Sequence, residues 1–192
     1  MMRALRHRGW KWRAMAFLFI ARDQAALAVI ERMLQEFPGD SYALASKGHL
    51  LAQLGRKRDA LETFAQLVAV DPANARHWFN YGFQLEEMEE FEQAEAAFRR
   101  ATELSPDLDR AWYGLGLVLI RLQRFDEAVV ALKKNTQLQP MSPYGWYQLA
   151  RVHVDRHEPD EALRIIRHLQ RFEPKVAAQL ERETGILASP AS

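Results

Sequence analysis

Two histidines and a glutamate near the end of the chain have the spacing that best matches a metal site. His153 and His157 are four positions apart, so on a helix both rings would lie on one face, and Glu161 follows them. Two imidazoles at this spacing can share a zinc ion. A hydrolytic zinc helix also carries a glutamate between its histidines, and this sequence has none there. The repeat register derived below gives both histidines structural places, so we predict no metal and no cofactor.

Other catalytic signatures are missing from the sequence. There is no cysteine, which excludes disulfides, thiolate metal sites and cysteine nucleophiles. Gly114 and Gly116 form an isolated glycine pair rather than a phosphate-binding loop, and no Gly-x-Ser-x-Gly segment occurs. The five glutamates between Glu86 and Glu92 are typical of a solvated turn. We therefore predict that the protein is not an enzyme.

The charge balance argues against nucleic acid as a partner. Lysine and arginine number 26 and aspartate and glutamate 25, so the net charge is only +1. The first 13 residues nevertheless carry five basic side chains and no acid: Arg3, Arg6, Arg8, Lys11 and Arg13. The apolar run that follows, Ala14 to Ala21, is too short to span a bilayer. We interpret it as part of a packed helix in a cytoplasmic protein; the alternative is a targeting or anchoring segment that makes the protein envelope-associated.

Four columns of residues recur every 34 positions along the chain. The first column is proline: Pro38, Pro72, Pro106, Pro140 and Pro174. The second is alanine: Ala26, Ala60, Ala94, Ala128 and Ala162. A bulky residue lies near the start of each period: Trp10, Leu44, Trp78, Trp112 and Trp146. A small residue follows four positions later: Ala14, Gly48, Gly82, Gly116 and Ala150. Because chance does not align four columns over five periods, the sequence predicts five copies of one structural unit.

Each period has room for two short helices and two turns. The small residue and the alanine indicate where two antiparallel helices come close, since larger side chains would separate them. Apolar residues at helical spacing, as in Ala94, Ala97, Phe98 and Ala101, mark the buried side of the second helix. The proline comes just after that helix because it cannot continue it. The sequence therefore predicts a stack of helix–turn–helix hairpins.

The segments from Trp78 to Gly82 and from Trp112 to Gly116 resemble the first-helix signature of the tetratricopeptide repeat (TPR) family. The spacing from Ala94 through Phe98 to Pro106 matches the second half of that repeat. The resemblance implies an all-α fold, a right-handed α-solenoid of antiparallel hairpins. Asn135 stands where the family pattern has a small apolar residue. Because a buried amide needs a partner, we predict that it forms an inter-helix hydrogen bond.

The repeat register divides the chain into four parts. We expect a basic N-terminal lead over 1–6, five repeats over 7–174 (about 7–40, 41–74, 75–108, 109–142 and 143–176), a C-terminal capping helix over 175–185 and a flexible tail over 186–192. The capping helix is expected to end at Gly185. Val176 and Leu180 would then cover the apolar side of the last hairpin, as a solenoid end requires.

The resemblance also implies a binding surface, because in this family the first helix of each unit lines a concave groove. The expected peptide-binding residues are Tyr42, His49, Arg76, Phe79, Asn80, Phe83, Arg110, Tyr113, Leu117, Ile120, Arg121, Tyr147 and Arg151. Aromatic rings bury a large area at low entropic cost, and arginines bind carboxylates. The expected partner is a protein or peptide with bulky apolar residues and some acidic ones.

This surface favours a non-catalytic adaptor or scaffold that binds a segment of a partner protein. Two alternatives use the basic, apolar N-terminus instead. One is self-assembly into a homo-oligomeric scaffold, and the other is recruitment to a membrane as an envelope-associated assembly factor.

Overall fold

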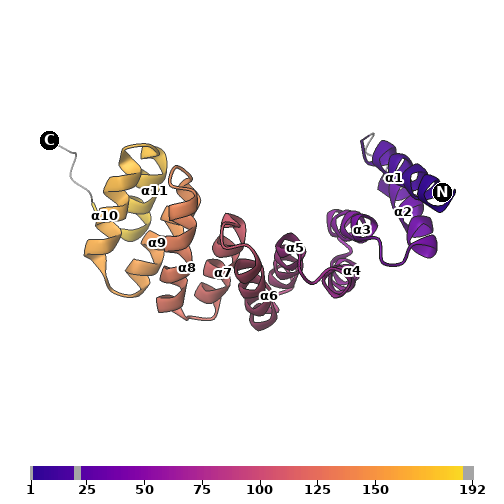
Figure 1. Cartoon of the computed structure of the whole chain (residues 1–192). Coiled ribbons are helices and arrows are strands. Elements are labelled where there is room, and N and C mark those ends of the chain that lie inside the picture. Colours follow the sequence, from indigo (N-terminus) through magenta and orange to yellow (C-terminus); the bar gives the residue numbers. More distant parts are fainter. Residues whose placement is uncertain (1, 20–22, 188–192) are drawn as a thin grey trace. The chain divides into compact units, whose positions relative to one another are not determined.

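The computed structural model describes residues 2–19 and 23–187, and every helix or strand assigned within these ranges is an α-helix (Figure 1). This confirms the all-α prediction. The apolar run from Ala14 to Ala21 lies partly outside the described residues. The chain divides into two compact units, with the boundary between Glu90 and Phe91. That boundary falls in the turn of the third predicted repeat.

The first unit is a series of antiparallel helices, each packed against the next in the chain. Its helices are α1 (Met2–Phe19), α2 (Asp23–Glu36), α3 (Ser41–Gln53), α4 (Lys57–Val70) and α5 (Ala75–Glu86). The side chains of Ile30, Met33, Leu51 and Leu67 are fully buried in its core. Asp40 caps α3, because its carboxylate accepts a hydrogen bond from the Ala43 amide.

The second unit continues the same pattern from α6 to the end of the described chain. Its helices are α6 (Phe91–Leu104), α7 (Asp109–Arg121), α8 (Phe125–Leu138), α9 (Pro143–Asp155), α10 (Pro159–Gln170) and α11 (Pro174–Thr184). Its fully buried side chains include Phe98, Leu119, Leu132 and Ile166. α11 packs on both α9 and α10, so it covers the end of the last hairpin. Gly185 follows it in the left-handed conformation, as predicted for the helix end.

The recurring small residues lie where helices approach closely. All five column alanines are completely buried: Ala26, Ala60, Ala94, Ala128 and Ala162. A β-carbon added to Gly48 would overlap the Phe64 ring, and one added to Gly116 would overlap Leu132. The predicted close contacts within hairpins are therefore present. Gly114 and Gly145 make the same kind of contact with the preceding hairpin, through Phe98 and Asn135.

The tryptophan and proline columns are joined by a repeated hydrogen bond. The indole nitrogens of Trp78, Trp112 and Trp146 each donate to a proline carbonyl six residues earlier, at 2.9, 3.0 and 2.9 Å. The acceptors are Pro72, Pro106 and Pro140. This bond ties the end of one hairpin to the first helix of the next. Pro174 differs from the other column prolines, because it begins α11 instead of following a helix directly.

The turns inside the hairpins also repeat. Gly55, Glu89, Gln123 and His157 all have a positive φ, between 59° and 75°, and are spaced 34 residues apart. In each turn, the amide of the residue after the positive-φ position donates to a carbonyl five positions earlier, as the Arg56 amide does to the Leu51 carbonyl. This bond closes the end of the first helix. His157 therefore lies in an inter-helix turn, as the register predicted.

Gly145 offers a direct test of the close approach between α8 and α9. The Gly145→Ala variant should lose about 1–3 kcal/mol of unfolding free energy, because the new methyl group displaces the Asn135 amide. Chemical denaturation followed by circular dichroism measures this loss. Gly9→Ala is the control: nothing lies within 4 Å of a β-carbon there, so stability should stay equal or rise by up to about 1 kcal/mol. Equal effects of the two substitutions would contradict the packing described.

Candidate functional site

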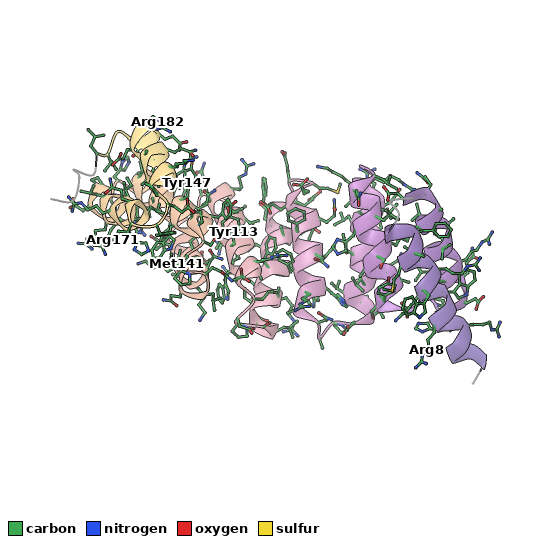
Figure 2. The ribbon with its side chains drawn as sticks, turned by 90° about the horizontal axis from the view of Figure 1, so that it is seen from above. Arg8, Tyr113, Met141, Tyr147, Arg171 and Arg182 are labelled. Atoms are coloured by element: carbon green, nitrogen blue, oxygen red, sulfur yellow. The ribbon has the colours of Figure 1, made fainter. Side chains whose placement is uncertain are left out.

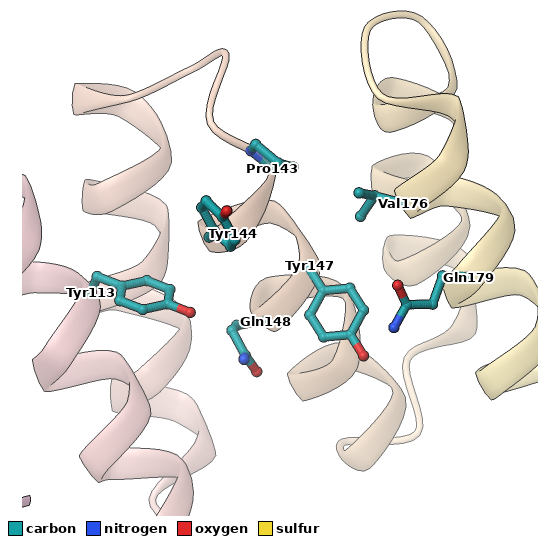
Figure 3. A pocket seen from close by; sticks show the side chains of 7 residues that line it. All are labelled: Tyr113, Pro143, Tyr144, Tyr147, Gln148, Val176 and Gln179. Atoms are coloured by element: carbon teal, nitrogen blue, oxygen red, sulfur yellow. The ribbon is translucent and has the colours of Figure 1, made fainter. Parts of the chain in front are cut away.

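A hollow of about 280 Å³ opens between three helices of the second unit. Tyr113 reaches it from α7, and Val176 and Gln179 reach it from α11. The residues from the start of α9 are Pro143, Tyr144, Tyr147 and Gln148. Figure 3 shows the three tyrosines arranged around the opening, with the Gln148 and Gln179 amides beside them. The lining is thus mainly aromatic and apolar, with a few hydrogen-bonding groups.

Local sequence fixes these side chains on the open face of α9. The helix starts at Pro143, whose fixed φ suits the first helical position. Tyr144 and Tyr147 are three residues apart and share one face, whereas Leu149 and Ala150 are buried. Tyr144 is 70 % exposed, an unusual state for so large a ring. The start of α9 therefore presents two tyrosines outward.

Tyr147 is held by a small polar network. Its hydroxyl donates to Oε2 of Glu183 at 2.5 Å, and Nε2 of Gln179 donates to the other oxygen at 2.8 Å. The hydrogen bond to Glu183 raises the pKa of Tyr147, and the same bond lowers the pKa of Glu183. The Arg151 guanidinium lies 5.9 Å from the centre of the Tyr147 ring. These contacts connect α11 to α9 at the edge of the hollow.

A second hollow, of about 450 Å³, adjoins the first and shares Tyr113 and Tyr144 with it. Its other lining residues are Asp109, Arg110, Asn135, Gln139 and Ser142. Arg110 is exposed there and can meet an acidic group. Asn135 is buried, and its Nδ2 donates to the Asp109 carbonyl at 2.9 Å. This confirms the predicted inter-helix hydrogen bond. The bond joins α8 to α7 on one side of the second hollow.

None of the predicted peptide-binding residues is buried, and all lie on the first helices of their hairpins. Those of the first unit are Tyr42 and His49 on α3 and Arg76, Phe79, Asn80 and Phe83 on α5. Those of the second unit are Arg110, Tyr113, Leu117, Ile120 and Arg121 on α7 and Tyr147 and Arg151 on α9. Of these, Tyr113 and Tyr147 come together around one hollow (Figures 2 and 3).

The first-unit residues form two pairs. The Phe79 and Phe83 rings have centroids 6.4 Å apart, and Phe83 is 51 % exposed. The His49 ring and the Asn80 amide are 3.2 Å apart, and partial burial lowers the pKa of His49. Near Tyr42, Lys11 approaches the ring at 5.0 Å. The α3 and α5 face therefore combines aromatic rings with polar groups and the exposed Arg76.

Two family models described as tetratricopeptide repeat match the chain, one over residues 24–78 and the other over residues 85–134. Together they cover more than half of its 192 residues. The chain belongs to the TPR family. A TPR repeat-containing protein of Dictyostelium discoideum is 41% identical over 69 residues, which make up 36% of this chain and 26% of that protein. The matched segment thus spans about a quarter of that relative.

Solved TPR structures have the same fold. The MamA protein superimposes with a TM-score of 0.80 at 19% identity, covering 97% of this chain and 96% of that one. YrrB, described as a TPR protein with an unusual peptide-binding site, gives a TM-score of 0.78 at 18% identity and covers 88% of each chain. These likenesses, with the all-helical architecture, show that the protein is an α-solenoid of TPR hairpins.

The TPR hairpin explains the two histidines that suggested a metal site. His153 is buried, and its Nδ1 lies 2.7 Å from a carboxylate oxygen of Glu158 in the adjoining turn. His157 is the left-handed residue of that turn. Among the residues that the structure describes, no three potential metal ligands gather at one place. His153 is thus a packed hydrogen-bonding residue of the fifth repeat.

Five residues around the first hollow were missing from the predicted binding set: Pro143, Tyr144, Gln148, Val176 and Gln179. Tyr144 occupies the same repeat position as Arg76 and Arg110, so the register did carry a signal for it. α11 begins 31 residues after α9, so its residues fall out of the 34-residue register. Ala177 and Leu180 are its buried residues, and Val176 turns toward the hollow instead of covering the last hairpin.

The Tyr147–Glu183 hydrogen bond predicts a pH-dependent attachment of α11. At pH 7, Tyr147→Phe should speed amide exchange in α11 by about two- to fivefold relative to wild type. Glu183 has a lowered pKa in the fold, so the bond persists below the ordinary value of 4.5 and is lost as pH falls through the lowered pKa. Hydrogen exchange read by NMR should therefore show wild type and variant converging in acid.

Tyr144→Phe is the control for this measurement, since it removes a hydroxyl from the same hollow on an exposed ring. It should leave α11 exchange unchanged at both pH values. A difference between wild type and Tyr147→Phe that persists unchanged in acid would show that the ionised Glu183 does not hold α11.

Proposed function

We propose that the protein is a non-catalytic adaptor that binds a segment of a partner protein on the first-helix face of its TPR hairpins. The observation that carries this proposal is the hollow framed by Tyr113, Tyr144 and Tyr147. Large rings at the rim of a preformed hollow are typical anchoring groups at protein interfaces, because they bury area with few rotatable bonds.

The charges beside the hollow indicate the chemistry of the bound segment. Arg110 lines the adjoining hollow, and Arg151 lies over the Tyr147 ring. Arginine binds carboxylates through two parallel hydrogen bonds. We infer that the segment places a bulky apolar side chain among the tyrosines and an acidic side chain near Arg110. Gln148 and Gln179 can hydrogen-bond the segment's backbone.

The first unit has exposed residues of the same kinds on its own first-helix face. Phe83 is exposed beside Phe79, and Arg76 is exposed on the same helix. The peptide-binding site named for YrrB belongs to that protein, but it shows that a fold of this kind can hold a peptide. We propose that the adaptor acts in the cytoplasm, since Ala14 of the apolar N-terminal run is buried as part of a folded hairpin.

Peptide selection tests this function without a known partner. Short random peptides selected on the wild-type protein should be rich in bulky apolar and acidic residues. Tyr113→Ala/Tyr144→Ala should bind the selected peptides at least about tenfold more weakly by fluorescence anisotropy, because two anchoring rings are removed. Val130→Ala is the control: Val130 is 66 % exposed, a fraction similar to the 70 % of Tyr144, but it lies on α8 and does not line either hollow.

Equal binding by the double variant and wild type, with both folded by circular dichroism, would contradict the proposed site. Selection of no peptide, together with a molecular mass that rises with protein concentration, would favour self-assembly instead. Arg110→Glu provides a second measurement, because it should weaken acidic peptides and leave binding of neutral ones within about twofold.

A further inference from the structure

Helix α1 has an exposed face that the peptide-binding function does not use. The helix packs on α2 through Ala14, which is fully buried, and through the partly buried Trp10 and Phe17. The opposite side carries Trp12, 72 % exposed, and Met15, 47 % exposed. Trp12 and Met15 are three residues apart and therefore neighbours on the helix surface. Their exposure makes an apolar patch at the solvent side of the first hairpin.

A basic side chain, Arg8, lies on the same side of α1 as this patch. Arg8 lies one helical turn before Trp12 and projects outward from α1 (Figure 2). Arg8 is exposed on the same side as Trp12 and Met15, whereas Arg6 lies four positions before Trp10 and so falls on the other side of the helix. The acid that approaches α1, Asp40, is engaged by His7 and by Lys11 at 3.8 Å. α1 itself contains no acidic residue. The exposed side of α1 is therefore both cationic and apolar.

We propose that this face of α1 binds peripherally to the surface of an anionic lipid bilayer. Tryptophan prefers the region between lipid headgroups and acyl chains, and a flexible methionine can enter the same layer. Arg8, which lies between Trp12 and Met15 around the helix, is then at the level of the lipid phosphates. Among the described helices, none is long and apolar enough to cross a membrane.

The same features favour lipid over nucleic acid or an acidic protein surface. Contacts with phosphate groups would explain the basic charge of α1. The side chains of Trp12 and Met15, however, gain the most free energy from transfer into an apolar medium, which a lipid bilayer supplies. The chain as a whole has a net charge of only +1, so the attraction is confined to this helix. The membrane surface would hold the adaptor at α1 while its tyrosine hollow lies on α7, α9 and α11.

Vesicle co-sedimentation of the full chain tests this proposal. The protein should bind vesicles of phosphatidylcholine with phosphatidylglycerol at least about tenfold better than pure phosphatidylcholine, and added salt should weaken the binding. Trp12→Ala/Met15→Ser and Arg8→Glu should each lower binding to the anionic vesicles by about tenfold or more. Arg171→Glu changes the charge equally on an exposed residue of the second unit and should have no such effect.

A second measurement guards against misfolded variants. Brominated anionic lipid should quench wild-type tryptophan fluorescence more than that of Trp12→Phe, which keeps an aromatic ring in the helix. Equal binding to neutral and anionic vesicles, or undiminished binding by both α1 variants, would overturn the proposal. Binding to duplex DNA without binding to vesicles would also overturn it and assign α1 to nucleic acid. Peptide binding by the tyrosine hollow is unaffected by any of these outcomes.

Discussion

The close approach of neighbouring helices at small residues is the constraint on which this structure depends. Alanines at one repeat position are completely buried in all five repeats, and glycines meet Phe64, Phe98, Leu132 and Asn135 at distances that admit no side chain. A dense interior leaves little room for a larger residue at these points. Each contact fixes the separation of two helices, and repetition of the contact every 34 residues builds the solenoid.

The arrangement of helices determines which residues remain available for binding. Burial of one face of each first helix turns the other face toward solvent, so Tyr144 is exposed on α9 while Tyr147 on α9 and Tyr113 on α7 are partly buried. Trp112 and Trp146 hold that face in place by bonding the prolines before their helices. The last helix completes the hollow, because Val176 and Gln179 supply a wall that α9 alone does not have. The repeated hairpins and the out-of-register helix α11 thus form the hollow together.

The 34-residue periodicity allowed the fold to be predicted from the sequence, because the same buried residue types recur at the same repeat positions five times. It also placed Asn135 and the two histidines correctly, since their register positions reveal burial or a turn. Val176 and Gln179 were beyond this reasoning, because α11 starts out of register with the repeats. The bond between Tyr147 and Glu183 joins residues on helices whose relative phase the sequence does not specify. The tryptophan–proline bond has constant spacing, but its geometry emerges only in three dimensions.

Fluorine NMR of the protein labelled with fluorotyrosine tests the location of the binding site most directly, because the chain has only five tyrosines. Tyr42 and Tyr81 belong to the first unit, and Tyr113, Tyr144 and Tyr147 line the hollow of the second. If the account is correct, adding a selected peptide shifts the resonances of the three hollow tyrosines more than the other two. A peptide that binds and leaves all three unmoved would contradict the account.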